Sequence, residues 1–504
     1  MDMSKQTKAV IIGAGIGGLG IAALLAKKSY DVEVYEKLSE PGGRAREFSA
    51  NGFRFDMGPS WYMMPDVFEE FFNLLGEDIA DHFSLQKLTP SYRIFLQSSN
   101  THYDFYADRQ KNAKLFESLE PGAGAKLNEY LDESARQYDI AKSEFIYRNY
   151  DSLFDFFNKR TLKEGRKLQI YRSMQSIIES TFDSEIIRKA MMFQMVLLGT
   201  APKDAPGMYR LMNHVDFDRG IWYPEGGIAA LPKALEAMAK KYGAKFTYNA
   251  PVSSITTQNG HATGIILEDQ TSVTADIVIS DADMVHTETS LLSEKDRSFP
   301  SSYWQKKTMA PSALILYLGL NRTYDNLMHH NLLFTKDWDQ NFKEIFHGTG
   351  FPSDPSIYVC APSKTDATVA PPGCENLFVL VPMAPGVTYN EETLQRWRDK
   401  TIEQLESHMQ LPGIAESIIY ERHYCVENFE QDYNSYKGSA LGLAHTLTQS
   451  ALWRPNNISK KVDNLYYVGA NTNPGIGMPT CLISAQTAYK RIEKIKNPSP
   501  LTEL

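Results

Sequence analysis

A glycine-rich segment near the N-terminus has the spacing of a dinucleotide-binding turn. Residues 13–18, GAGIGG, satisfy the pattern Gly-x-Gly-x-x-Gly. The first glycine permits a tight turn, the second lets the backbone approach a pyrophosphate, and the third lets the following helix pack on the strand. The free N–H groups at the start of that helix favour an anion. The predicted phosphate contacts are Gly13, Gly15, Ile16, Gly17 and Gly18.

An acidic residue follows at the distance that this kind of site requires. Glu36 comes eighteen residues after Gly18, at the end of the next predicted strand. A carboxylate there accepts hydrogen bonds from ribose hydroxyls and repels a 2′-phosphate. Glu36 and its neighbour Lys37 are therefore candidate cofactor contacts. This pattern alone does not separate FAD from NAD.

A second glycine pair lies a few residues further on, in Pro41-Gly42-Gly43-Arg44. Here the backbone returns toward the phosphates, and an arginine can neutralise their charge. Gly43 and Arg44 are the candidate contacts. Taken by itself, the segment is also compatible with an ordinary turn.

The elements that must position these residues are an apolar strand over 9–12, a helix over 19–28 and a strand over 32–36. This order is a βαβ unit, whose crossover is almost always right-handed. Ser29 stands where the helix should stop and where glycine is the usual left-handed residue. We expect a local energetic cost there without a change of fold.

The rest of the chain alternates between helical and strand-like stretches. Helical spacing runs from about 121 to 198, and strand signals occur at 245–248, 264–267, 275–280, 313–318, 356–359 and 377–381. We expect an α/β fold, α+β overall: a dinucleotide-binding Rossmann-like domain, an interleaved mixed-sheet substrate domain, and a helical lid or membrane-facing subdomain. The expected boundaries are 1–85, 215–290 and 440–504 for the first, 86–110 and 291–439 for the second, and 111–214 for the third.

Length and composition exclude several classes of protein. A chain of 504 residues exceeds the size of a single hydrophobic core. A net charge of −9 argues against nucleic acid as a partner. The four cysteines lack metal-site spacing, so no metal is expected. We find no targeting signal and no run long enough to cross a membrane. We therefore expect a cytoplasmic protein whose membrane contact is peripheral, at the inner face of the membrane.

Several motifs along the chain resemble those of the carotenoid (phytoene) desaturase family, within the FAD-dependent amine oxidase-like superfamily. They are EKLSEPGGRAR at 36–46, FDMGPS at 55–60, WYPEGG at 222–227 and YYVGANTNPGIGMP at 466–479. The resemblance spans about residues 8–492 and implies FAD as the cofactor, so the first domain is expected to be an FAD-binding Rossmann-like domain. The further contacts that it implies are Gly58, Pro59, Ser60, Val252, Gly469, Ala470, Asn471, Gly475, Gly477 and Met478.

The resemblance also implies the reaction, in which a hydride leaves one carbon of a polyene and a proton leaves its neighbour. The flavin takes the hydride, so no catalytic triad is required. Glu225 and Asp56 are weak candidates for an acid or base, and each is equally compatible with a structural role. The hydrophobic carotenoid must be held by apolar surface. The reduced flavin needs oxygen or a quinone as electron acceptor.

An aromatic and basic stretch suggests where the protein meets a membrane. Phe145, Tyr147 and Tyr150 begin it, and lysines and arginines follow between 159 and 172. Basic and aromatic side chains together suit an interfacial helix on anionic lipid. A solvated helix face is the alternative explanation.

Other functions remain open at this point. Within the family, a carotenoid 3,4-desaturase, an isomerase or a saturase would share the same motifs. An amine oxidase and a non-enzymatic isoprenoid-binding protein are less favoured, because the first needs an aromatic cage and the second would be expected to lose FAD motifs. The motifs do not fix the carotene, the number of steps or the oligomeric state.

Overall fold

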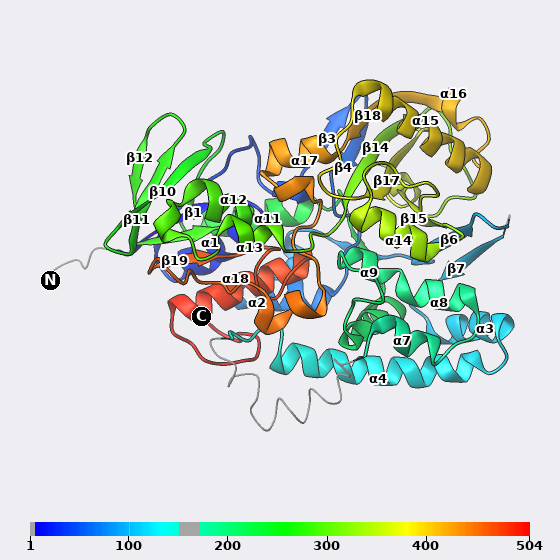
Figure 1. The fold of residues 1–504 in the computed structure, drawn as a ribbon, viewed down its shortest axis with the longest axis horizontal. Helices are drawn as coiled ribbons and strands as arrows, with labels where there is room; N and C mark the ends of the chain where they lie inside the picture. Colours follow the sequence, from blue (N-terminus) through cyan, green and yellow to red (C-terminus); the bar gives the residue numbers. More distant parts are fainter. Residues whose placement is uncertain (1–5, 100, 151–171) are drawn as a thin grey trace.

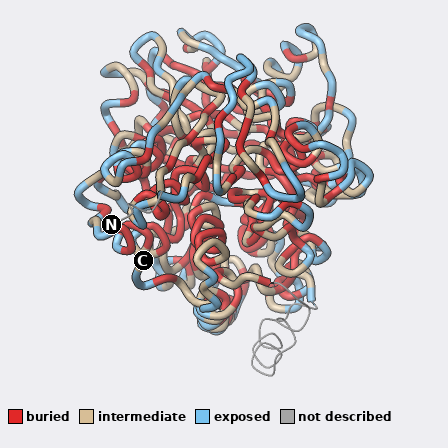
Figure 2. The backbone as a smooth tube through the Cα atoms, turned by 90° about the vertical axis from the view of Figure 1, so that its left-hand side faces the viewer, coloured by how far each residue is buried: buried red, intermediate tan, exposed pale blue. Residues whose placement is uncertain are grey.

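Two large sheets, three smaller ones and a helical region make up the described part of the protein (Figure 1). The computed structural model describes residues 6–99, 101–150 and 172–504. The sheet that contains the N-terminal strand lies at one end of the long axis in Figure 1, and a larger sheet lies at the other end, above a group of helices. The buried segments run through the centre of the molecule (Figure 2). The expected α/β fold with a Rossmann-like unit and a second mixed sheet is confirmed.

The first sheet has five parallel strands in the order β19-β13-β1-β2-β9. These are β1 (Lys8–Ile12), β2 (Asp31–Tyr35), β9 (Lys245–Thr247), β13 (Ile277–Ser280) and β19 (Leu465–Tyr467). Strands from three distant parts of the chain therefore pair in one sheet. The centre of the sheet is buried on both faces, which explains the apolar runs at 9–12 in β1 and 277–279 in β13.

The crossover between β1 and β2 is the helix α1 (Ile16–Lys27). It begins three residues before the predicted start, because residues 16–18 of the glycine motif already form its first turn. At its other end Ser29 adopts a φ of 67°, in the left-handed region. The N–H groups of Ser29 and Tyr30 donate to the carbonyls of Ala26 and Leu25. Serine thus fills the capping position that usually holds glycine.

Side chains of β1 alternate between two cores. Ala9 and Ile11 pack among helices, whereas Val10 and Ile12 pack against a small antiparallel sheet. The helices are α1, α2 (Pro65–Leu74), α11 (Ala230–Lys241) and α18 (Met478–Ile492). The small sheet consists of β10 (Val252–Gln258), β11 (His261–Leu267) and β12 (Ser272–Thr274). This layering presents the carboxyl ends of the parallel strands, where the glycine turn lies, to the rest of the protein.

The second sheet has seven strands in the order β18-β14-β17-β16-β15-β6-β7, and only β15 and β6 run parallel. The strands are β6 (Tyr92–Leu96), β7 (His102–Phe105), β14 (Ser312–Leu320), β15 (His330–Phe334), β16 (Ile357–Cys360), β17 (Glu375–Met383) and β18 (Ile418–Tyr424). Leu314 and Leu316 pack toward α15 (Glu391–His408), while Ile315 and Tyr317 face the opposite core. That opposite core includes side chains of β4 (Phe53–Asp56), which pairs with β3 (Glu47–Ala50).

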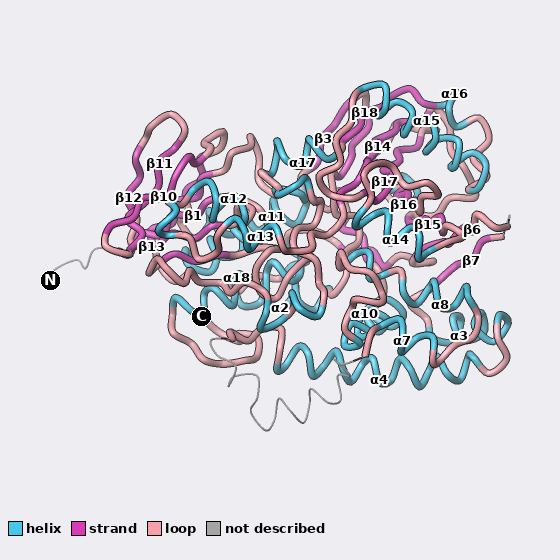
Figure 3. The backbone as a smooth tube through the Cα atoms, viewed as in Figure 1, coloured by secondary structure: helices cyan, strands magenta, loops and turns pink. Residues whose placement is uncertain are grey.

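The helical region lies below the second sheet in Figure 3. Its helices are α3 (Arg109–Leu119), α4 (Ala123–Glu144), α7 (Met174–Glu179), α8 (Glu185–Met192), α9 (Gln194–Leu197) and α10 (Leu211–His214). Among the described residues, none of the helices combines the length and hydropathy needed to span a bilayer. The expected division into three domains, with its boundaries, stays a prediction.

The proposed membrane segment is only partly described. Residues 151–171, which carry most of its aromatic and basic side chains, lie outside the described residues. Phe145, Tyr147 and Tyr150 at its start are buried inside the protein. These three side chains are therefore not available to a lipid surface, contrary to the sequence-based interpretation.

The remaining elements are short. β5 (Leu85–Lys87) pairs with β8 (Trp222–Pro224). The other short helices are α12 (Met284–His286), α13 (Ser301–Gln305), α14 (Trp338–His347), α16 (Ile414–Ser417) and α17 (Val426–Tyr433). Single turns are η1 (Gly43–Ala45), η2 (Ile79–Asp81), η3 (Gly207–Arg210), η4 (Val215–Arg219), η5 (Thr287–Leu291), η6 (Glu294–Asp296), η7 (Pro362–Lys364), η8 (Tyr436–Gly438), η9 (Leu447–Gln449) and η10 (Ala451–Trp453).

Candidate functional site

The glycine motif forms one wall of a large cavity of about 550 Å³. Gly13, with a φ of 97°, makes the turn out of β1, and Gly15 and Gly17 line the cavity at the start of α1. A Cβ atom on Gly17 would lie 2.9 Å from the backbone nitrogen of Gly469. Gly18 does not line the cavity. A Cβ atom there would lie 2.1 Å from the carbonyl oxygen of Gly13, so Gly18 allows the close packing of helix and strand.

Glu36 lies beside this turn, directly after β2. Its carboxylate accepts hydrogen bonds from the N–H groups of Ala14 at 2.7 Å and Leu38 at 2.8 Å. Burial raises the pKa of Glu36, while these two N–H groups lower it. The side chain lines the cavity together with Lys37 and with Val252 at the start of β10. Lys37 also donates to the Asn434 side chain at 3.2 Å.

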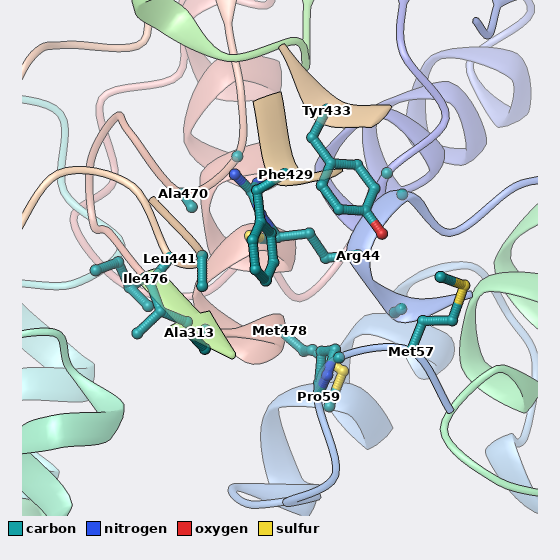
Figure 4. A pocket seen from close by; sticks show the side chains of 18 of the residues that line it. Arg44, Met57, Pro59, Ala313, Phe429, Tyr433, Leu441, Ala470, Ile476 and Met478 are labelled. Atoms are coloured by element: carbon teal, nitrogen blue, oxygen red, sulfur yellow. The ribbon is translucent and has the colours of Figure 1, made fainter. Parts of the chain in front are cut away.

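The second glycine pair, Gly42-Gly43, contacts the first glycine turn, as the sequence predicts. The N–H of Gly42 donates to the carbonyl of Ala14 at 2.8 Å, and Gly43 and Arg44 line the cavity. Arg44 donates to Ser435 at 3.1 Å and lies 5.4 Å from the ring centre of Tyr433. Its Nε is buried and has no partner within the described residues. Arg44 therefore offers a cationic donor to the cavity, beside Phe429 and Tyr433 of α17 (Figure 4).

Two of the predicted C-terminal contacts have other roles. Gly469, Ala470, Gly477 and Met478 line the cavity, as do Gly58, Pro59 and Ser60 after β4. The side chain of Asn471 points elsewhere, accepting from the N–H of Leu443 at 2.8 Å and donating to Asp283 at 2.9 Å. Gly475 packs on His445, whose Nε2 would lie 2.0 Å from an added Cβ atom. Neither lines the cavity, so both act by shaping the loop.

Two residues that the motifs did not indicate hold this C-terminal loop in place. Arg454 is buried and donates to the carbonyls of Leu443, Gln449, Ala470 and Thr472. His445 accepts from the N–H of Ile476 at 3.0 Å and pairs with Tyr209 through Nδ1. Burial lowers the pKa of His445, so the ring is neutral and can accept that bond. Both residues lie outside any local motif, which is why the sequence did not reveal them.

Asp281 is another residue that the sequence analysis missed. It follows β13 and lines the cavity, with its carboxyl group beside the first turn of α1. Burial raises its pKa to about 7, and the charge of Glu36 adds to this effect. The N–H groups of Gly18 and Gly15 and the charge of Arg44 act in the opposite direction. An acidic group thus shares the N–H donors that a pyrophosphate would use.

Beyond the glycine motifs the same cavity becomes apolar. It extends between α9 and the strands β15–β17 of the larger sheet, with α14 alongside. The side chains of this apolar end are Phe193, Val196, Leu197, Leu198, Leu332, Phe334, Trp338, Phe342, Ile345, Ile357, Phe378 and Leu380. Apolar area of this kind retains a hydrocarbon at about 25 cal/mol per Å² removed from water. The helical stretch therefore contributes one wall of the space that a hydrocarbon would fill.

The two candidate acid-base residues lie outside this main cavity. Glu225 is exposed and accepts from the Ser84 hydroxyl at 2.5 Å, as a turn carboxylate does. Asp56 is half-buried and accepts from the N–H groups of Ile228 at 3.0 Å and Ala229 at 3.3 Å, just before α11. Burial raises the pKa of Asp56 to about 7. Asp56 lines only a small second cavity, so neither residue contacts the main one directly.

A buried cluster next to Asp56 also escaped the sequence analysis. His329, His330 and Cys360 have potential ligand atoms within 4.8 Å of one another. The two histidines are adjacent at the start of β15, and Cys360 ends the neighbouring strand β16. His329 bonds Thr365 at 2.8 Å, and His330 bonds Tyr358 at 2.8 Å, both through Nδ1. Antiparallel pairing of two strands brings these residues together, and no spacing along the chain reveals that.

The residues of the main cavity fit FAD. The glycines provide an approach to the backbone that any side chain would block, as the Cβ contacts at Gly15 and Gly17 demonstrate. The buried, unpartnered Nε of Arg44 is suited to an anion or a polar ring edge. FAD in this site would be held by the glycine turn, Glu36, Val252, Arg44 and the backbone of the 469–478 loop. These individual contacts stay predictions.

Comparison with known families and curated relatives agrees with this geometry. Residues 16–492 match the family described as flavin-containing amine oxidoreductases. The chain is 41% identical to a carotenoid 3,4-desaturase of Haloarcula japonica, over 98% of this chain and 99% of that protein. It is 36% identical to a zeta-carotene-forming phytoene desaturase of Myxococcus xanthus, over 98% of this chain and 95% of that protein.

Solved structures share the fold at lower identity. An oxidoreductase from Methanosarcina mazei superposes with a TM-score of 0.63 at 20% identity, covering 96% of this chain and 100% of that one. A putrescine oxidase bound to putrescine gives a TM-score of 0.61 at 15% identity, covering 97% and 99%. At these identities the likeness concerns the fold alone.

Proposed function

The chain belongs to the flavin-containing amine oxidoreductase family, and we propose that within it the protein is an FAD-dependent carotenoid desaturase. It acts on CH–CH groups of a hydrophobic polyene and introduces C=C bonds. The single observation that carries this function is the shape of the main cavity. One end is lined by the glycine turns, and the other by apolar side chains between α9 and the larger sheet.

FAD, when bound, supplies the acceptor for the hydride that leaves the substrate. The protein contributes the rest. The glycine turn and Arg44 would hold the phosphate-bearing part of the cofactor, and the 469–478 loop would hold its other part. The apolar end positions the polyene and keeps water from the reacting carbons, which matters because a carbon that loses hydride becomes electron-poor. No charged side chain is needed to recognise a hydrocarbon.

The substrate can be narrowed to a class. Phytoene and related carotenes are the candidates, with a carotenoid 3,4-desaturation as the second possibility. The 41% identity to the Haloarcula japonica enzyme favours 3,4-desaturation. An amine substrate is disfavoured, because the apolar end of the cavity offers a cation no carboxylate among its described lining residues.

Three further features belong to the same proposal. The protein works in the cytoplasm, peripherally associated with the inner face of the membrane, because its substrate partitions into the bilayer. The electrons leave through oxygen or a quinone, since the flavin must be reoxidised after each hydride transfer. The three-domain division described from the sequence is consistent with a cavity whose walls come from the two sheets and the helices.

The experiment that tests the function is expression in cells that accumulate one defined carotene at a time. Phytoene, zeta-carotene and lycopene are supplied separately, and the products are separated by chromatography. We expect a product with at least one additional double bond from one of them. A Gly17→Ala variant, which closes the glycine turn, is the matched control and should leave every carotene unchanged. Unaltered carotenes with the wild-type protein as well would refute the proposal.

A further inference from the structure

A tyrosine hydroxyl joins the main cavity to the buried histidine cluster. Tyr358 of β16 lines the cavity. Its Oη lies 2.6 Å from the hydroxyl of Ser60 and 2.8 Å from Nδ1 of His330. Ser60 itself lines both the main cavity and the small one behind it. Tyr358 therefore has one face toward the substrate space and a hydrogen-bonded path that leads away from it.

The path ends in a group that can accept a proton. Burial lowers the pKa of His330 well below its usual range, so the ring is neutral. A neutral imidazole has one nitrogen with a free electron pair. When that nitrogen is Nδ1, the Tyr358 hydroxyl donates to it and the Ser60 hydroxyl donates to Tyr358. Both hydrogen bonds then point from the cavity toward His330.

One neighbour of His330, Trp61, stabilises a brief positive charge on the ring. The ring stacks on Trp61 with centroids 4.6 Å apart and planes 13° from parallel. An aromatic face attracts a cation by its electron-rich surface. Burial and the neighbouring His329 both lower the pKa of His330, although burial also lowers the pKa of His329 to about 3, so this second ring is neutral at rest. A charged imidazolium at His330 is therefore short-lived.

The proposed reaction also releases one proton from the substrate, and this proton needs an acceptor. When a hydride departs from one carbon, the adjacent C–H bond becomes strongly acidic, because its electrons are drawn into the forming double bond. Even a weak base removes that proton. Asp56 and Glu225 do not line the main cavity, so among the described residues they are not placed to receive it directly.

We infer that Tyr358 is the catalytic residue that receives this proton, and that it hands its own hydroxyl proton to Nδ1 of His330 in the same movement. The C–H electron pair becomes the new C=C bond, and the hydride carries two electrons to the bound flavin. Because the pKa of His330 is low, the ring holds the proton only briefly before releasing it to solvent, and Ser60 positions the hydroxyl. This inference rests on the proposed function, since it supplies that reaction with its proton acceptor.

The test uses the FAD-loaded protein mixed without oxygen with phytoene or lycopene in phosphatidylcholine vesicles. Loss of the oxidised flavin absorbance reports the rate of the chemical step. Tyr358→Phe removes only the hydroxyl and should slow this step about 100-fold, the usual contribution of a positioned acid or base. Tyr62→Phe is the matched control. Its hydroxyl is buried without a partner and lies outside the cavity lining, so the rate should stay unchanged.

A second readout is the effect of D2O on the rate of flavin bleaching. Because a hydroxyl proton moves in the inferred step, the wild-type flavin should bleach more slowly in D2O than in H2O, and Ser60→Ala should weaken this difference. Equal rates in the two solvents, or a Tyr358→Phe variant as fast as wild type, would overturn the inference and leave the desaturase function standing. No bleaching of the wild-type flavin with either carotene would instead overturn the function, and the inference with it.

Discussion

The carboxyl group of Asp281 lies so close to Gly15 that a Cβ atom on this glycine would stand 2.5 Å from Oδ2. The same carboxyl group would meet a Cβ atom on Gly17 at 2.5 Å through Oδ1. It therefore lies against the first turn of α1 and lines the same cavity as Gly15 and Gly17, where a pyrophosphate is expected. An acidic residue at an anion site makes cofactor binding depend on the charge of that residue.

The affinity for FAD should fall as pH rises through the pKa of Asp281, which burial raises to about 7. Below that pH the carboxyl group is neutral, and above it a negative charge faces the pyrophosphate. Glu36 and Arg44 are the other charged groups that act on it, with opposite signs. We expect Kd to increase about tenfold from pH 6 to pH 8.5, equivalent to about 1.4 kcal/mol. Titration of the protein with FAD, followed by flavin fluorescence, measures this change.

Asp281→Asn is the matched variant for that prediction. It keeps the shape and removes the charge, so its Kd for FAD should be nearly constant over the same pH range. A pH dependence identical to that of the wild type would show that another group controls binding.

Gly17→Ala should prevent FAD binding, because its Cβ atom would lie 2.9 Å from the nitrogen of Gly469 and 2.5 Å from Asp281. Overpacking of this kind costs about 1–3 kcal/mol where it forces a backbone shift. The flavin content of the purified protein, read from its visible spectrum, checks the prediction. Gly350→Ala is the control, since no atom lies within 4 Å of its added Cβ. A yellow Gly17→Ala protein would contradict the role assigned to the turn.

Asp56 should stabilise the fold through the start of α11. Asp56→Ala leaves the N–H groups of Ile228 and Ala229 without their acceptor and should lower the free energy of unfolding by about 1–3 kcal/mol. Urea unfolding measures this loss. Asp56→Asn keeps an acceptor oxygen and should lose less. If both variants were as stable as the wild type, the carboxyl group would not have the capping role that the structure gives it.

Asp56 should also make the stability of the folded protein depend on pH. The pKa of Asp56 is about 7 in the folded protein, above the ordinary value of about 3.9 for an unfolded chain. The folded state therefore binds more protons between these two values, and its stability falls as pH rises through this window. Asp56→Asn should show a smaller fall between pH 5 and pH 8 than the wild type. If stability fell equally with pH in the two proteins, a group other than Asp56 would cause the pH dependence.

Polar substitution at the apolar end of the cavity should impair substrate binding and spare the cofactor. Leu197 ends α9 and lines that end. Leu197→Gln should raise KM up to about tenfold, since burying a whole leucine side chain contributes about 1.5–3 kcal/mol. FAD content should be unchanged. Ile419→Gln, at a 52% exposed residue of β18 outside the cavity lining, is the control. If Leu197→Gln had the same KM as Ile419→Gln, Leu197 would not belong to the substrate site.

The difference between what the sequence predicted and what it missed has a physical basis. The turn from Gly13 to Gly18 and the return at Gly42 are local, so motif spacing determined their geometry. Asp281 and Tyr358 reach the cavity only through the pairing of strands distant in the chain. Nothing in their immediate neighbours along the chain indicates this. A wider search for acidic residues after apolar strands would have found Asp281, because β13 is such a strand.

Local sequence patterns also did not indicate which way some side chains point. The motif around Asn471 implied a flavin contact, yet this side chain joins Asp283 and Leu443 instead. Whether a loop residue faces the cavity or the protein depends on which distant groups need a hydrogen-bond partner. For the same reason Glu225 and Asp56 were equal candidates in the sequence, and only their burial and partners separate them.

The most direct test of the central claim is a single turnover. FAD-loaded protein is mixed without oxygen with an excess of each carotene in vesicles, and both flavin reduction and the carotene product are quantified. We expect that one of the carotenes bleaches the flavin and yields one new C=C bond for each flavin reduced. Flavin that stays oxidised with every carotene, or bleaching without a desaturated product, would contradict it.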